Sequence, residues 1–100
     1  MPVAEAALAR VVREGDALRF GGALDRGATA ALWTQALAVI AGVRRFELGE
    51  VSGVDSAGLA LLAELAARAG GPVAIAGDPP GLAALREAYR LGAGLEYAAS

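Results

Sequence analysis

Histidine, cysteine and lysine are absent from this sequence of 100 residues. Without cysteine, the chain can form neither disulfide bonds nor zinc–thiolate sites. Without histidine, it cannot supply the serine or cysteine triads, or the metal–histidine sites, that many enzymes use. The net charge is −2 and no basic cluster is present, so nucleic acid is not an expected partner.

A long apolar run is missing as well. The longest stretch without a charge, Gly27 to Val43, contains two threonines and a glutamine and is a poor membrane span. The first ten residues include Glu5 and lack a basic start followed by an apolar segment, so no targeting segment is expected. We therefore expect a cytoplasmic protein with no direct membrane insertion.

Hydrophobic residues make up 56% of the chain and charged residues 20%, which excludes a disordered tail. A chain of this length has room for one core, so residues 1–100 are expected to form a single domain.

Hydrophobic periodicity predicts the order β-β-α-β-α-β-α. The expected strands are 8–13, 17–20, 45–48 and 73–76, and the expected helices are 26–41, 56–69 and a third that starts near 78 and ends near 91. Gly21 and Gly22 are expected to end the second strand, and residues 49–55 to form a loop.

This order predicts an α/β fold with a mixed, mostly parallel sheet, because strand–helix–strand units pair in parallel. Arg19 and Glu47 point away from their apolar neighbours in the expected strands, which indicates one exposed sheet face. The helices should then pack mainly on the other face. Asp25, Asp55 and Asp78 each precede an expected helix and are predicted to cap it.

The segment Val51–Gly58 is the most informative part of the sequence, because it joins a strand to a helix at the carboxyl edge of the sheet. Ser56 stands at the helix start, where a hydroxyl can cap free N–H groups and an added phosphate would be tolerated. Gly58 is expected to let the helix approach the sheet closely. The alternative is that Asp55 and Ser56 are ordinary capping residues.

The helix that follows has leucines on one broad arc and alanines on a separate strip. Glu64 and Arg68 are spaced to form an i, i+4 pair. The alanine strip, Ala60, Ala63 and Ala67, has nothing obvious to bury it and is a candidate docking surface for another protein. The alternative is that alanine is present only as a good helix former.

Other candidate sites are weak. Gly21-Gly22 and Gly77–Gly81 do not match a phosphate-binding loop, and turn chemistry explains both. Together with the missing histidine and cysteine, this disfavours a nucleotide-binding or nucleotide-hydrolysing protein. Trp33 lies on the apolar arc of its helix and is expected in the core.

Glu47-Leu48, Val51 and the run Val54-Asp55-Ser56-Ala57-Gly58-Leu59 resemble the signature of STAS domains. The family includes bacterial anti-sigma factor antagonists, and the resemblance implies that Ser56 occupies their phosphoacceptor position. The predicted element order and the length agree with this family.

Three further segments resemble the small STAS subunit of the Mla phospholipid-transport ABC system: Leu24-Asp25-Arg26, Leu32-Trp33 and Tyr89-Arg90-Leu91. This resemblance implies a non-catalytic subunit, without cofactor or metal, that binds the transporter ATPase and through it a permease. It would lie at the inner membrane and support the lipid asymmetry of the outer membrane. The implied contact residues are Asp55, Ser56, Ala57, Ala60, Ala63 and Ala67.

The sequence departs from the antagonist pattern at Ala57 and Ala60, where serine and glycine are common, and Glu47 stands where the family usually has aspartate. The first two changes leave docking possible but disfavour regulation by a kinase. The alternative function is an anti-sigma factor antagonist that binds an anti-sigma factor kinase and is switched off by phosphorylation of Ser56.

Overall fold

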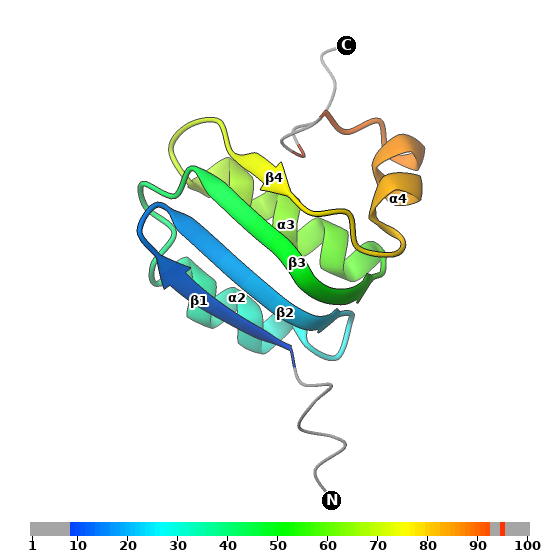
Figure 1. Ribbon diagram of the computed structural model, residues 1–100, viewed down its shortest axis with the longest axis horizontal. Helices are drawn as coiled ribbons and strands as arrows, with labels where there is room; N and C mark the ends of the chain where they lie inside the picture. Colours follow the sequence, from blue (N-terminus) through cyan, green and yellow to red (C-terminus); the bar gives the residue numbers. More distant parts are fainter. Residues whose placement is uncertain (1–8, 93–94, 96–100) are drawn as a thin grey trace, which may run out of the picture.

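The computed structural model describes residues 9–92 and Leu95, which form a four-stranded sheet with helices packed on one of its faces (Figure 1). Along the chain the elements are β1 (Arg10–Glu14), β2 (Ala17–Leu24), α2 (Thr29–Leu37), β3 (Arg45–Val54), α3 (Ser56–Arg68), β4 (Ala74–Ala76) and α4 (Leu82–Ala88). The predicted order β-β-α-β-α-β-α is confirmed.

The strands lie in the sheet in their order along the chain, β1-β2-β3-β4. β1 and β2 form an antiparallel hairpin through a turn in which Gly15 has a φ of 61°. β2 pairs with β3, and β3 with β4, in parallel. The sheet is therefore mixed and mostly parallel, as predicted.

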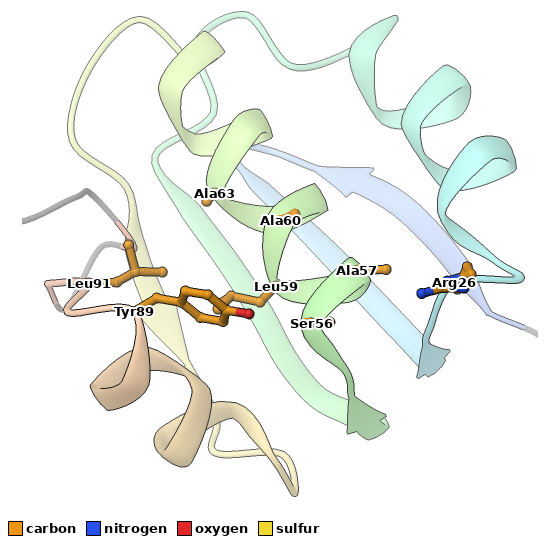
Figure 2. A pocket seen from close by; sticks show the side chains of 8 residues that line it. All are labelled: Arg26, Ser56, Ala57, Leu59, Ala60, Ala63, Tyr89 and Leu91. Atoms are coloured by element: carbon orange, nitrogen blue, oxygen red, sulfur yellow. The ribbon is translucent and has the colours of Figure 1, made fainter.

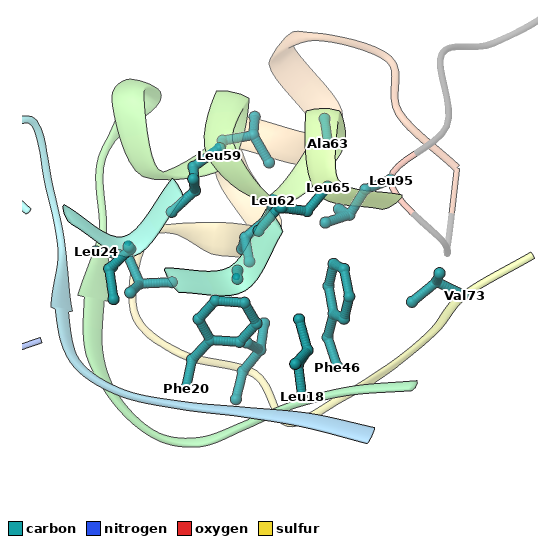
Figure 3. Close-up of a cluster of buried hydrophobic side chains, with 14 of the residues drawn as sticks. Leu18, Phe20, Leu24, Phe46, Leu59, Leu62, Ala63, Leu65, Val73 and Leu95 are labelled. Carbon is teal, nitrogen blue, oxygen red and sulfur yellow. The ribbon is translucent and has the colours of Figure 1, made fainter. Parts of the chain in front are cut away.

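The core lies between the sheet and the helices α2 and α3 (Figure 3). At its centre the rings of Phe20 and Phe46 meet edge to face with centroids 5.5 Å apart. The opposite face of the sheet is open and carries ion pairs, among them Arg19 with Glu47 at 3.5 Å and Arg10 with Glu50 at 2.7 Å. These pairs are exposed, so each adds little stability, but they confirm the prediction of one solvated sheet face.

Two strands run further than the sequence pattern predicted. β2 continues through Gly21 and Gly22 to Leu24, and β3 continues to Val54, so residues 49–54 are not a loop. Gly21 pairs with Glu50 and Gly22 with Val51, with register shifts on either side of these pairs. Ladder hydrogen bonds come from the backbone, so pairing between two neighbours compensates for the low strand preference of glycine.

Two helices start later and end earlier than predicted. α2 begins at Thr29 because Asp25 first closes a turn, with its Oδ1 accepting from the Ala28 N–H at 3.1 Å. The prediction that Asp25 caps this helix is therefore wrong, since Ala28 holds the N-cap position. α2 ends at Leu37, and just beyond it the Arg13 guanidinium donates to the carbonyl of Val39 at 2.6 Å. The Arg13 side chain thus supplies the Val39 carbonyl with a hydrogen bond that a backbone N–H would supply in a longer helix.

α4 begins at Leu82 rather than at Asp78, so Asp78 is not its N-cap. Gly81 precedes the helix with a φ of 92°. The Val54 N–H donates to the Pro80 carbonyl at 3.0 Å, which holds this segment along the end of β3. The chain therefore follows the sheet edge before it can turn into a helix.

Candidate functional site at the start of helix α3

β3 leads directly into α3 at the carboxyl edge of the sheet, with only Asp55 between them. Asp55 is extended and caps the helix, because its Oδ1 accepts from the Gly58 N–H at 2.9 Å. The prediction that Asp55 is a capping residue is confirmed. Leu59 follows with a backbone hydrogen bond to the Asp55 carbonyl at 2.9 Å, which closes the first helical turn.

The second oxygen of the same carboxylate reaches another part of the chain. Asp55 Oδ2 accepts from the backbone N–H of Arg26 at 3.2 Å, and the Asp55 N–H donates to the Leu24 carbonyl at 3.2 Å. The pKa of Asp55 lies below its usual range, chiefly because of the hydrogen bond from the Gly58 N–H and to a smaller extent because of the one from the Arg26 N–H. Asp55 is thus an ionised acceptor at neutral pH that ties the turn before α2 to the start of α3.

Ser56 is the first residue of α3 and is exposed. Asp55 supplies the cap, so the hydroxyl of Ser56 is not required for that role. Two residues further on, Gly58 is buried against β2, and a Cβ added there would overlap the carbonyl oxygen of Leu24. The predicted close approach of helix and sheet at Gly58 is confirmed.

Ala57 and Ala60 form a low ridge on α3 with a groove on each side, because both residues line both grooves. The first groove has a volume of about 370 Å³ and lies between α3 and the C-terminal segment (Figure 2). Its lining is Arg26, Ser56, Ala57, Leu59, Ala60, Ala63, Tyr89 and Leu91. The second groove, of about 460 Å³, lies between α3 and α2 and includes Trp33.

The predicted alanine strip is broken at its centre. Ala60 and Ala67 are exposed, but only 6% of Ala63 is accessible. Leu95, itself 1% exposed, belongs to the same buried cluster as Ala63 (Figure 3). The expectation that nothing buries Ala63 is wrong, because a residue from the end of the chain packs into the same core.

Two side chains on this surface differ from their predicted roles. Trp33 packs against the core but is only partly buried, so it also forms a wall of the second groove. Arg68 places its guanidinium 5.2 Å from the centre of the Trp33 ring. Among the ion pairs of the described residues, none joins Glu64 to Arg68 as the i, i+4 spacing predicted.

Arg26, Tyr89 and Leu91 also line the first groove, although none of the three was predicted as a site residue. Tyr89 follows α4 directly and is 51% exposed. The sequence signal for these residues was that Leu24-Asp25-Arg26 and Tyr89-Arg90-Leu91 resemble segments of the small STAS subunit.

In the part of the chain that the structure describes, no group of three or more acidic, histidine or cysteine residues could hold a metal ion. Nor is any described helix long and apolar enough to cross a membrane.

A family model described as "Mlab, STAS domain" matches residues 8–96. No curated protein matches the sequence. Among solved structures, one titled "Crystal Structure Analysis of Mglu" is 26% identical over 72% of this chain, with a TM-score of 0.45. The matched region spans only 19% of that chain.

Proposed function

The chain belongs to the Mlab-type STAS domain family, and from this membership we propose that it is a non-catalytic subunit of a phospholipid ABC transporter. In this role it binds the ATPase subunit, and through it the permease, at the cytoplasmic side of the inner membrane. The function served is maintenance of outer-membrane lipid asymmetry.

The observation that carries this proposal is the ridge of Ala57 and Ala60 with a groove on each side, the first of which Ser56 also lines. Small side chains on a helix let another protein approach closely, and grooves beside them accept that protein's larger side chains. The two carboxylate oxygens of Asp55 accept from the Gly58 N–H and the Arg26 N–H, which holds the start of α3 in place. The surface is therefore preorganised for binding.

The two carboxylates near this ridge are engaged by backbone N–H groups: Asp25 in the turn before α2, and Asp55 as the cap of α3. The chain also lacks histidine and cysteine. These features support a binding role rather than catalysis.

The test is co-expression with an ABC ATPase of the same cell, followed by measurement of affinity on purified proteins. Ala60→Arg should weaken binding by at least about tenfold, because a long charged side chain separates the two surfaces. Ala31→Arg is the matched control: Ala31 is also an exposed helical alanine, but it lies outside both grooves. Equal affinities of the two variants, both folded, would remove the ridge from the interface.

A second candidate function is favoured by the exposure of Ser56 at the start of a helix, where phosphate is tolerated. In this alternative the chain is an anti-sigma factor antagonist. It predicts that Ser56→Asp abolishes binding to an anti-sigma factor kinase while Ser56→Ala keeps it. Recovery of such a kinase instead of an ATPase, together with phosphate on Ser56 by mass spectrometry, would select this alternative.

A further inference from the structure

We propose that Tyr89, Leu91 and Arg26 complete the docking surface, and that the partner segment seated in the first groove carries an apolar side chain next to a carboxylate. This inference rests on the proposed function, since it specifies the chemistry of the ATPase segment that the subunit binds.

The apolar half of the groove comes from two distant parts of the chain. Leu59, Ala60 and Ala63 contribute from α3, and Tyr89 and Leu91 contribute from the segment that follows α4. In Figure 2 the Tyr89 ring extends across the groove beside Leu59, with its hydroxyl on the side of Ser56. A partner side chain inserted there would cover the aromatic ring that the isolated chain leaves half exposed.

At the other end of the groove lies Arg26, the one charged residue of its lining, whose charge also helps to lower the pKa of Asp55. Arg26 is exposed, and no ion pair joins its guanidinium to a carboxylate among residues 9–92. The nearby Asp55 carboxylate uses one oxygen for the Gly58 N–H and the other for the Arg26 N–H. A carboxylate from the partner is the charge complement that this end of the groove favours.

The two ends together define the occupant. The groove is too small for a folded element, since about 370 Å³ is near the lower limit of pockets that bind small ligands. It suits one apolar side chain with a neighbouring aspartate or glutamate directed at Arg26. The open sheet face offers no such combination, because its arginines already have acidic partners.

The experiment measures affinity of the full chain for the co-purified ATPase by calorimetry. Tyr89→Ala should weaken binding by about tenfold or more, whereas Tyr89→Phe should keep it, because the ring rather than the hydroxyl fills the groove. Val12→Ala is the matched control, since Val12 is also 51% exposed but lies on the open sheet face. Melting curves report the folding of each variant.

The charged end has its own readout. Arg26→Gln should weaken binding and flatten its dependence on salt between about 50 and 300 mM, while Arg26→Lys should retain that dependence. Arg10→Gln, on the open face, is the control for loss of one positive charge.

Failure of the groove assignment and failure of ATPase binding give different results. If the wild type binds the ATPase and both Tyr89→Ala and Arg26→Gln bind as tightly, the inference is wrong and the proposed function stands. If the wild type binds no ATPase, the proposed function fails first. If Tyr89→Ala instead abolishes self-association of the chain, the groove belongs to a second copy and the inference is overturned.

Discussion

The β3–α3 and β4–α4 junctions lie at the same edge of the sheet, and each contains an aspartate after its strand, but the two are built differently. At the first junction a single residue, Asp55, separates strand from helix and caps α3. At the second, residues 77–81 intervene, and Asp78 lies too early to cap α4. An aspartate after a strand therefore caps the next helix only where that helix begins at the following residue.

The glycines at the two junctions explain the difference. Gly58 lies inside α3, where it lets the helix rest on the Leu24 carbonyl immediately after the strand. Gly77 and Gly81 have φ values of 102° and 92° and lie against the backbones of β3 residues. One junction therefore uses glycine for contact between helix and sheet, whereas the other uses it to lead the chain along the edge.

The largest effect should come from Gly58→Ala, which would force a Cβ into the backbone of Leu24. Backbone atoms cannot move aside as a flexible side chain can, so we expect a loss of about 3 kcal/mol or more in the free energy of unfolding. Chemical denaturation measures it. Gly70→Ala is the control, because Gly70 has a φ of 91° but open space around its Cβ position, so only backbone strain is added. Equal losses for the two variants would show that close contact is not what Gly58 provides.

Next in size is the contrast between the two aspartates. Asp55→Ala should lower Tm by roughly 3–10 °C, because it removes the cap of α3 and the link to the turn before α2. Asp78→Ala should change Tm by no more than about 2 °C. Thermal melts of both variants test the pair, and similar shifts would contradict the distinction between the junctions.

The pH dependence of that contrast gives a finer test. The pKa of Asp55 is lowered in the folded state, so its contribution to stability is present above the pKa of the unfolded chain and is lost as pH falls through the folded value. The stability gap between wild type and Asp55→Ala should therefore be constant near neutrality and narrow below roughly pH 4. Unfolding curves across this range measure the gap. A gap that widens on acidification would contradict an ionised cap.

The smallest effect is expected from Ser56→Ala. Asp55 holds the cap position and Ser56 is an exposed first helical residue, so stability should change by no more than about 0.5 kcal/mol. Any loss of partner binding by this variant would then report contact rather than unfolding. A stability loss as large as that of Asp55→Ala would return the capping role to Ser56.

The start of α3 could be predicted from the sequence because residues close together in the chain determine it. An aspartate, a short helix-starting segment and Gly58 lie within a few residues, and each keeps its predicted structural part. The strand ends at Gly21 and Gly49 were misjudged because glycine has low strand preference and only pairing between β2 and β3 compensates for it.

The groove could not be predicted from local pattern for a different reason. Its walls come from residues as far apart as Arg26 and Leu91, and no periodicity relates them. The same holds for Ala63, which is buried in one cluster with Leu95, a residue from a part of the sequence without a strong pattern. Contacts between distant segments set these features, and one sequence does not encode them locally.

The sheet order β1-β2-β3-β4 has a consequence for how the molecule is assembled. Each strand pairs with the one made just before it, so no strand has to wait for a later part of the chain. The β1–β2 hairpin needs only a tight turn, and each following strand can add to an edge that already exists. The sheet can therefore grow from β1 towards β4 in the order of synthesis, with the free edge always ready for the next strand.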